Sequence, residues 1–185
     1  MAAGAGAGRK RFRATAPLIA SSLDAALWLH DRGRRGDGHV QMQQLHCLLY
    51  MAQGTYAAVH YGRMLMPAIF VAEENGPVEP TVFHAFEDGR PPLAPRRFAP
   101  PAENFLASIW RKLGHHSTDH LVKRIRDHRA YREALAGGAG TVMPLDVLAE
   151  DFREHKPRGA KKIRTEDGRA LEKWIPTAKP AGREI

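Results

Sequence analysis

Cysteine is almost absent from this chain of 185 residues, in which Cys47 is the single example. One thiol cannot form an internal disulfide, and it cannot build a structural zinc site that needs several thiolates. A chain without disulfides is typical of a reducing compartment, so we expect a cytoplasmic protein. The thiol has His46 beside it, but neighbours in sequence point apart on a helix, which favours a buried, inert Cys47.

Long apolar runs are also lacking. The longest, 64–72, is interrupted by Pro67 and is far too short to cross a bilayer, so we expect no membrane segment. Basic residues crowd 9–13, but the long apolar stretch that a secretion signal requires does not follow them. A basic start without acids also fits an organelle transit peptide, and that alternative stays open.

Acidic side chains are scarce at the two ends of the chain. Residues 1–13 hold four basic groups and no acid, and residues 155–185 hold nine basic groups and four acids. The middle, 14–154, holds the other 15 basic and 16 acidic groups, so the net charge of +8 belongs to the ends. This distribution indicates a folded body with cationic tails. We expect a disordered basic arm at 1–16, a helical domain at 17–154 and a flexible basic tail at 155–185.

What the sequence does have is helical periodicity, strongest within 40–61. Leu48 and Ala57 widen its apolar stripe, as expected for a helix that is packed on more than one side. We predict that this helix is the buried centre of a compact, mainly α domain, with one short strand or hairpin near 64–72. The residues that define the stripe recur at alternating steps of three and four, the spacing of one helical face: Met42, Leu45, Leu49, Ala52, Tyr56 and Val59.

The rest of the middle predicts shorter elements around that helix. Ile69, Phe70 and Val71 favour the extended strand. Apolar spacing, capping residues, proline and glycine predict the others: a helix over 17–30, a sharp rigid turn over 73–80, a short helix over 80–86, a surface loop over 88–101, a helix over 102–113, one helix from 117 towards 135, and a last helix that starts at 143–146.

Motifs that carry chemistry are missing as well. The chain has no GxSxG, HExxH or GK[ST] sequence, so no serine nucleophile, zinc-protease helix or phosphate loop is indicated. His116 and His120 stand four residues apart and could share a helical face, with Asp119 or His128 near enough to complete a metal site. Exposed or ordinary hydrogen-bonded histidines explain this spacing better. We expect no enzyme activity, no cofactor and no metal.

Three stretches are informative because of their order. They are LHCLLYMAQ at 45–53, AEENGPVEP at 72–80, and the segment 117–128, which begins with Ser-Thr and ends with Asp-His. In this order they resemble the Panacea-domain family, which includes SocA-like antitoxins and phage-associated proteins. The similarity covers 18–153, most of the expected domain.

The chain departs from the family pattern at three positions. Cys47 stands where the family usually has Lys, and Glu73 stands where it usually has Trp. Tyr131 takes the place of a later Trp. If these positions form a recognition surface, this chain has altered it.

The resemblance implies a non-catalytic antitoxin that binds a cognate protein toxin directly and blocks it. SocA-like members are also implicated as proteolytic adaptors, which deliver the bound toxin to a ClpXP-type AAA+ protease. We predict that the 76–78 turn is mainly structural. The motif residues are the candidates for toxin binding: Tyr50, Gln53, Glu73, Glu74, Asn75, Gly76, Pro77, Val78, Pro80, His128 and Tyr131. The candidates for the second partner lie in the basic tail: Lys161, Lys162, Arg164 and Trp174.

A nucleic-acid-associated regulator that uses the basic ends is the alternative. Basic groups next to aromatic rings, as at 96–98 and 173–174, can bind nucleic acid by charge and by stacking. The balanced charge of 14–154 makes nucleic acid the less favoured partner.

Overall fold

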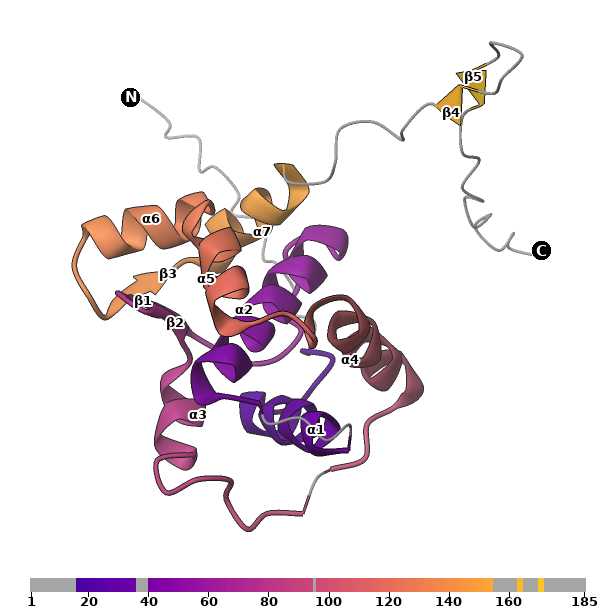
Figure 1. Cartoon of the computed structure of the whole chain (residues 1–185), viewed down its shortest axis with the longest axis vertical. Coiled ribbons are helices and arrows are strands. Elements are labelled where there is room, and N and C mark those ends of the chain that lie inside the picture. Colours follow the sequence, from indigo (N-terminus) through magenta and orange to yellow (C-terminus); the bar gives the residue numbers. More distant parts are fainter. Residues whose placement is uncertain (1–15, 36–39, 95, 155–162, 165–169, 172–185) are drawn as a thin grey trace, which may run out of the picture. The chain divides into compact units, whose positions relative to one another are not determined.

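The computed structural model divides the chain into a body, 1–154, and a C-terminal unit, 155–185. The described residues are 16–35, 40–94, 96–154, 163–164 and 170–171 (Figure 1). In the C-terminal unit the described residues form β4 (Ile163–Arg164) and β5 (Ala170–Leu171), which pair antiparallel. The predicted disordered arm and most of the predicted tail therefore lie outside the described residues.

The described part of the body is mainly helical, as predicted, and includes one small antiparallel sheet. None of its helices is long and apolar enough to cross a membrane. In chain order its elements are α1 (Ser22–Arg34), α2 (Met42–Val59), β1 (Phe70–Glu73), β2 (Gly76–Val78), α3 (Pro80–Ala85), α4 (Pro100–Leu113), α5 (Thr118–Arg126), α6 (Arg129–Ala136), β3 (Thr141–Met143) and α7 (Leu145–Glu154).

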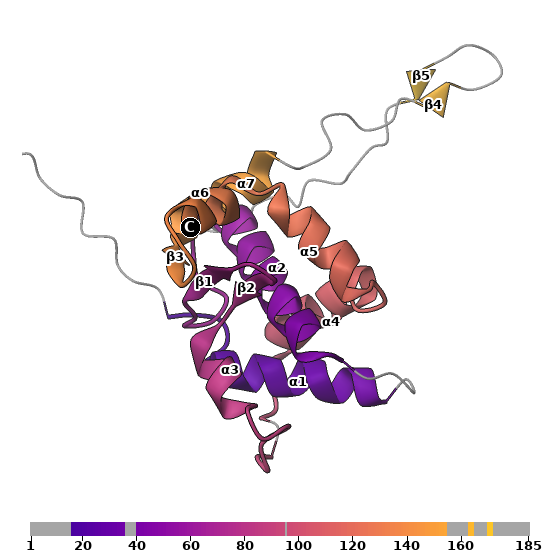
Figure 2. The same cartoon turned by 60° about the vertical axis from the view of Figure 1, so that its left-hand side comes forward.

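The predicted central helix is confirmed as α2. Figures 1 and 2 show it running through the middle of the body, and it packs against α1, α4, α5, α7 and β2. Every residue of 45–54 is buried, so the helix is covered all round and not only along one stripe. The prediction that Val59 lies on the buried face is wrong, because Val59 is in the last turn of α2 and is 53% exposed. Directly after it, the chain leaves the helix through Tyr61 and Gly62, both at positive φ.

Close packing of α7 on α2 depends on a glycine. A Cβ atom on Gly54 would lie 2.3 Å from the ring of Phe152 in α7. Atoms cannot approach so closely, so any larger residue at this position pushes the two helices apart. Gly54 therefore sets the distance at which α7 covers the centre of the body.

The first helix begins later than predicted. The chain is not helical from Pro17 to Ser21, and Ser21 is the N-cap of α1 because its Oγ accepts a hydrogen bond from the Leu23 N–H at 3.1 Å. The preceding segment is fixed by Ile19, whose side chain is buried and whose N–H donates to the Leu65 carbonyl at 2.8 Å. The start of α1 is therefore set by the capping residue Ser21 and not, as predicted, by Pro17.

The predicted strand near 64–72 is β1, at the end of that range. It pairs with β2 through a two-residue turn, Glu74-Asn75, with Glu73 opposite Gly76. The expected turn over 73–80 is thereby corrected, because 76–78 is a strand and the turn proper is shorter. The third strand, β3, was not predicted; it pairs with the other edge of β1 and gives the sheet order β2-β1-β3.

The helix predicted from 117 towards 135 is two helices. Ser117 caps α5 as expected, since its Oγ accepts from the His120 N–H at 3.3 Å, but the helix ends at Arg126. A new helix starts because the Asp151 carboxylate of α7 accepts hydrogen bonds from the N–H groups of Arg129 (3.0 Å) and Ala130 (2.8 Å). The break therefore comes from a residue of another helix.

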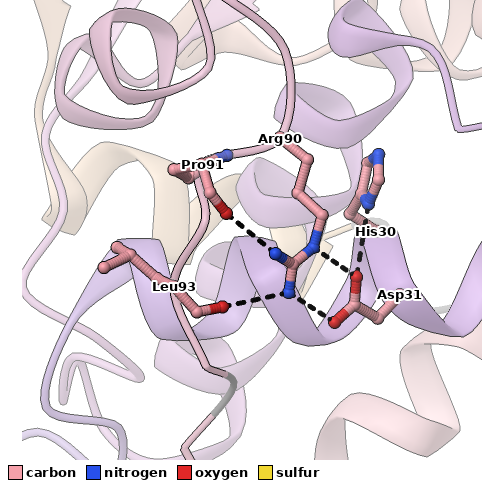
Figure 3. A network of polar contacts seen from close by, with 5 residues as sticks. All are labelled: His30, Asp31, Arg90, Pro91 and Leu93. Carbon is pink, nitrogen blue, oxygen red and sulfur yellow. Dashed lines mark hydrogen bonds and ion pairs between the residues drawn. The ribbon is translucent and has the colours of Figure 1, made fainter.

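The loop predicted over 88–101 ends at Ala99, because Pro100 and Pro101 form the first turn of α4. The loop is held against α1 by one cation. Arg90 binds the Asp31 carboxylate through two hydrogen bonds, of 2.6 and 2.8 Å, and donates to the Pro91 and Leu93 carbonyls (Figure 3). These bonds are the first cause of the lowered pKa of Asp31, and a smaller effect comes from His30. The proline-rich segment is thus anchored by an ion pair and not by regular structure.

Candidate functional site

Tyr50 lies at the centre of the motif residues and is fully buried. Its hydroxyl is 3.2 Å from Nδ1 of His128, and its ring packs edge-on against Phe70 of β1. Burial raises the pKa of the Tyr50 phenol, with a smaller contribution from the charge of Asp151. A neutral, buried phenol joins α2 to the junction between α5 and α6, so Tyr50 contributes to packing and not to a binding surface.

His128 and Tyr131 are brought to the same place by the helix break. His128 is the N-cap residue of α6, and its ring lies against Tyr50 and Phe152. Tyr131 is only 1% exposed, and its hydroxyl donates a 2.6 Å hydrogen bond to the Glu73 carbonyl. Tyr131 thus ties α6 to the end of β1.

Gln53 acts on a different segment. Its Oε1 accepts from the N–H groups of Leu65 and Met66, both at 3.2 Å, and its Nε2 donates to the Met66 carbonyl at 3.2 Å. The amide therefore satisfies the backbone of the buried chain that follows α2. Gln53 is not part of the same cluster as Tyr50 and His128.

The β1–β2 hairpin is held by side chains that reach its carbonyl oxygens. Gln43 of α2 donates to the Pro77 carbonyl at 3.0 Å, and Arg126 of α5 donates to the Glu74 carbonyl at 3.1 Å. The hydroxyl of Tyr131 holds the Glu73 carbonyl, as described above. Gly76 has φ +124°, and a Cβ there would lie 2.6 Å from the Gln43 amide nitrogen. The backbone of the hairpin is thus fixed from α2, α5 and α6 together.

The segment that leaves the hairpin is fixed by His46 of α2. Its Nδ1 accepts from the Glu79 N–H at 3.2 Å, and the Glu79 carboxylate accepts from the Val82 N–H at 2.7 Å. Pro80 stands in the first turn of α3, where its missing N–H costs nothing. Within the described residues Nε2 of His46 is buried without a hydrogen-bond partner, and burial lowers the pKa of His46 to about 4.

Exposure divides the predicted toxin-binding residues. The tip of the hairpin, Glu74 and Asn75, is exposed, while Glu73, Val78 and Pro80 are half-buried. The remaining candidates are buried: Tyr50, Gln53, Gly76, Pro77, His128 and Tyr131. Most of the motif therefore forms a frame, and only its tip is open to a partner.

Cys47 and Glu73 also differ from each other in burial. Cys47 is fully buried, and burial raises the pKa of its thiol to about 12, against a smaller opposing effect of Gln43. Glu73 is half-buried at the hairpin end. A thiol with so high a pKa stays protonated and unreactive at neutral pH, as the sequence predicted for Cys47.

A cationic surface on α5 was missed when the charge was averaged over 14–154. Residues 111–132 contain seven basic and two acidic side chains, a net of +5, so the rest of 14–154 has a net of −6. The signal was present in the sequence, in a window of one helix and its neighbours. Three histidines, His115, His116 and His120, stack beside the basic groups with ring centroids 4.3 Å apart in each successive pair.

The two histidines weighed as metal ligands, His116 and His120, are among those stacked rings, with their planes 18° apart. The described part of the chain holds no group of three His, Cys, Asp or Glu side chains placed to bind a metal ion.

Of the four candidate residues in the tail, the structure describes only Arg164. Lys161, Lys162 and Trp174 lie outside the described residues, and Arg164 belongs to β4, where its backbone pairs with Ala170.

Comparisons of the chain with protein-family models, with curated proteins and with solved structures give no match, and its function is therefore inferred from its own residues.

Proposed function

We propose that this protein is a cytoplasmic antitoxin, a binding protein that neutralises a cognate protein toxin by direct contact. The observation that carries the proposal is the fixed hairpin. Side chains from three helices, those of Gln43, Arg126 and Tyr131, hold its carbonyl oxygens while Glu74 and Asn75 stay exposed. A surface that is ordered before binding loses less conformational entropy when a partner docks, and this favours tight, specific protein recognition.

The buried titratable groups support a binding role over a catalytic one. General acids and bases work best with a pKa near the working pH. Burial moves the pKa values of three groups on α2 away from neutral pH. It raises the pKa of Cys47 to about 12, raises that of Tyr50 and lowers that of His46 to about 4. Each of them is held in its neutral form, which suits a packed interior.

Co-expression with the product of the neighbouring small gene tests this proposal. We expect that product to stop growth when expressed alone, and we expect growth to resume when this chain is present. The two proteins should then co-purify through size-exclusion chromatography. A neighbouring product that is harmless alone and does not co-purify would contradict the antitoxin proposal.

Delivery of the toxin to a ClpXP-type protease is a second step within the same proposal. The resemblance to SocA-like proteins suggests it, and the basic unit 155–185 is the candidate contact. A pulse-chase experiment measures it: the toxin should decay quickly with the full chain and persist when 155–185 is deleted or when the protease is absent. A toxin that is stable in all three strains leaves the chain as a simple blocking antitoxin.

Nucleic acid is the second candidate partner, because cationic groups occur at both ends and again within 111–132. Non-specific binding of this kind weakens steeply with salt, since it depends on the release of counterions. Deleting 1–13 and 155–185 should remove most salt-sensitive binding to a random DNA duplex. Tight, sequence-specific binding by the remaining 14–154 would instead favour a nucleic-acid regulator over an antitoxin.

A further inference from the structure

The exposed side of α5 carries a row of basic side chains and histidines, for which no ion pair with a carboxylate is found among the described residues. Leu121, Val122 and Ile125 are buried on its inner side. The outer side presents His120, Lys123 and Arg124, and His116 continues the row in the preceding turn. We call these four residues the cationic strip: His116, His120, Lys123 and Arg124. Figure 2 shows α5 at the edge of the body.

The spacing of the strip within α5 follows from helix geometry. His120 and Arg124 are four residues apart, so they stand one above the other on the same face, about 6 Å apart along the axis at 1.5 Å per residue. His116 precedes the N-cap residue Ser117 and lies outside the helix, but its ring stacks on that of His120 with centroids 4.3 Å apart.

The charges of the strip lack counterions of their own. Among the described residues no carboxylate forms an ion pair with Lys123 or Arg124, whereas Arg129 on α6 binds Glu150 at 2.6 Å. The pKa of His116 is lowered, first by desolvation and then by the like charges of His115, His120 and Arg124. Lys123 and Arg124 therefore have no carboxylate partner among the described residues, and an anionic partner would supply one.

We propose that the cationic strip is the docking surface for an acidic segment of a protein partner. Opposite charge supplies the complementarity, and it speeds association by steering the partner to this side of the body. The part of the row on the helix, about 6 Å from His120 to Arg124, matches about two residues of an extended peptide at about 3.3 Å each. The inference rests on the proposed function only where it identifies that partner as the toxin.

Two acidic side chains favour a short protein segment over nucleic acid. Asp119 and Asp127 are both exposed and lie near the two ends of α5. A phosphate backbone that continued along the helix in either direction would come close to one of these carboxylates and be repelled by its negative charge. A short acidic segment fits between them, over His120, Lys123 and Arg124.

The test uses the full chain and a fluorescein-labelled peptide of alternating Glu and Ser, measured by fluorescence anisotropy at low salt. The variant is Lys123→Glu/Arg124→Glu. The matched control is Arg34→Glu/Arg35→Glu, which makes the same charge change at two exposed positions at the end of α1. We expect the strip variant to bind the peptide at least about tenfold more weakly, and the control to stay within about twofold of the wild type. Equal losses in both variants mean that only the overall charge matters and overturn the proposal.

A second arm replaces the peptide with a random DNA duplex at the same ionic strength. We expect the two charge-reversed variants to lose duplex binding to a similar extent, because that binding follows the charge of the whole chain. If the strip variant loses the duplex while the peptide still binds normally, the strip serves nucleic acid and the proposal fails. The neutral pair Lys123→Gln/Arg124→Gln should show an intermediate loss of peptide binding, and circular dichroism checks that every variant is folded.

Failure of this inference and failure of the antitoxin proposal give different results. If the wild type co-purifies with the neighbouring gene product and the strip variant does so equally well, the docking surface is wrong and the antitoxin proposal stands. If the wild type does not co-purify but the peptide effect is found, the antitoxin proposal is wrong and the surface stands.

Discussion

The β1–β2 hairpin and α5 are neighbours in the fold, but the hairpin carbonyls have donors within the protein, whereas Lys123 and Arg124 form no ion pair with a described residue. In the hairpin, carbonyl oxygens are matched by donors from Gln43, Arg126 and Tyr131. On α5, Lys123 and Arg124 face outward without an ion-pair partner among the described residues. On the functions proposed above, this difference would be a division of work: the buried motif residues keep the hairpin rigid, and the exposed groups at its tip and on α5 are left for a partner.

This comparison predicts that buried frame residues affect stability most. Asp151→Ala removes the acceptor of two N–H groups, that of Arg129 and the buried one of Ala130, and leaves both without that partner. We expect the free energy of unfolding in urea to fall by about 2–4 kcal/mol. The control is Ser117→Ala, which removes an exposed cap of α5 and should cost no more than about 1 kcal/mol. Equal losses would mean that Asp151 is an ordinary helix cap.

The frame should also weaken in acid because of His46. Its pKa is about 4 in the folded protein and about 6.5 when exposed, so between these values the unfolded state binds the extra proton. Stability therefore falls as the pH is lowered, and from pH 7 to pH 5 the loss is about 2 kcal/mol. Urea unfolding of the wild type and of His46→Asn at both pH values measures it, since Asn keeps an acceptor near Nδ1 but does not titrate. A wild type and variant with the same pH dependence would contradict the assignment.

Within the hairpin we expect Gly76→Ala to destabilise by about 1–3 kcal/mol. Its φ of +124° disfavours any L side chain, and the new Cβ would displace the Gln43 amide from the Pro77 carbonyl. Thermal melting measures the loss. Pro77→Ala, at a position next to it, should lower stability less, by about 1 kcal/mol or below. Unchanged melting of Pro77→Ala together with lost toxin binding would show that the strand contacts the toxin directly.

The smallest effect on stability is expected on the other side of the comparison. Lys123→Glu/Arg124→Glu changes two exposed side chains that form no ion pair with a described residue, so the free energy of unfolding should stay within about 0.5 kcal/mol of the wild type. Urea unfolding with the α1 control, Arg34→Glu/Arg35→Glu, checks this. A loss comparable to that of Asp151→Ala would mean that the strip helps to hold the body together.

Local signals in the sequence predicted the helices well and their junctions badly. The spacing of Leu45, Leu49 and Ala52 depends on nearby residues alone, and α2 was found. The break between α5 and α6 depends on Asp151, more than twenty residues further along, so no local pattern indicates it. The strand β3 is equally hidden, since three residues become a strand only by pairing with β1.

The candidate site was predicted in part. The three motif stretches do bring Tyr50, His128 and the hairpin together, but the sequence could not show that most of these side chains face inward. Burial is decided by the packing of distant elements. The cationic strip could have been found by counting charge over one helix and its neighbours, because helical spacing alone aligns His120 with Arg124.

Co-purification of two variants with the neighbouring gene product tests the division between frame and surface most directly. Tyr131→Phe removes the hydroxyl that holds the Glu73 carbonyl, and Lys123→Glu/Arg124→Glu reverses the charge of the strip. We predict that Tyr131→Phe melts at a lower temperature but keeps its partner below that temperature, whereas the strip variant melts like the wild type and loses its partner. A strip variant that keeps the partner while a folded Tyr131→Phe loses it would contradict the account.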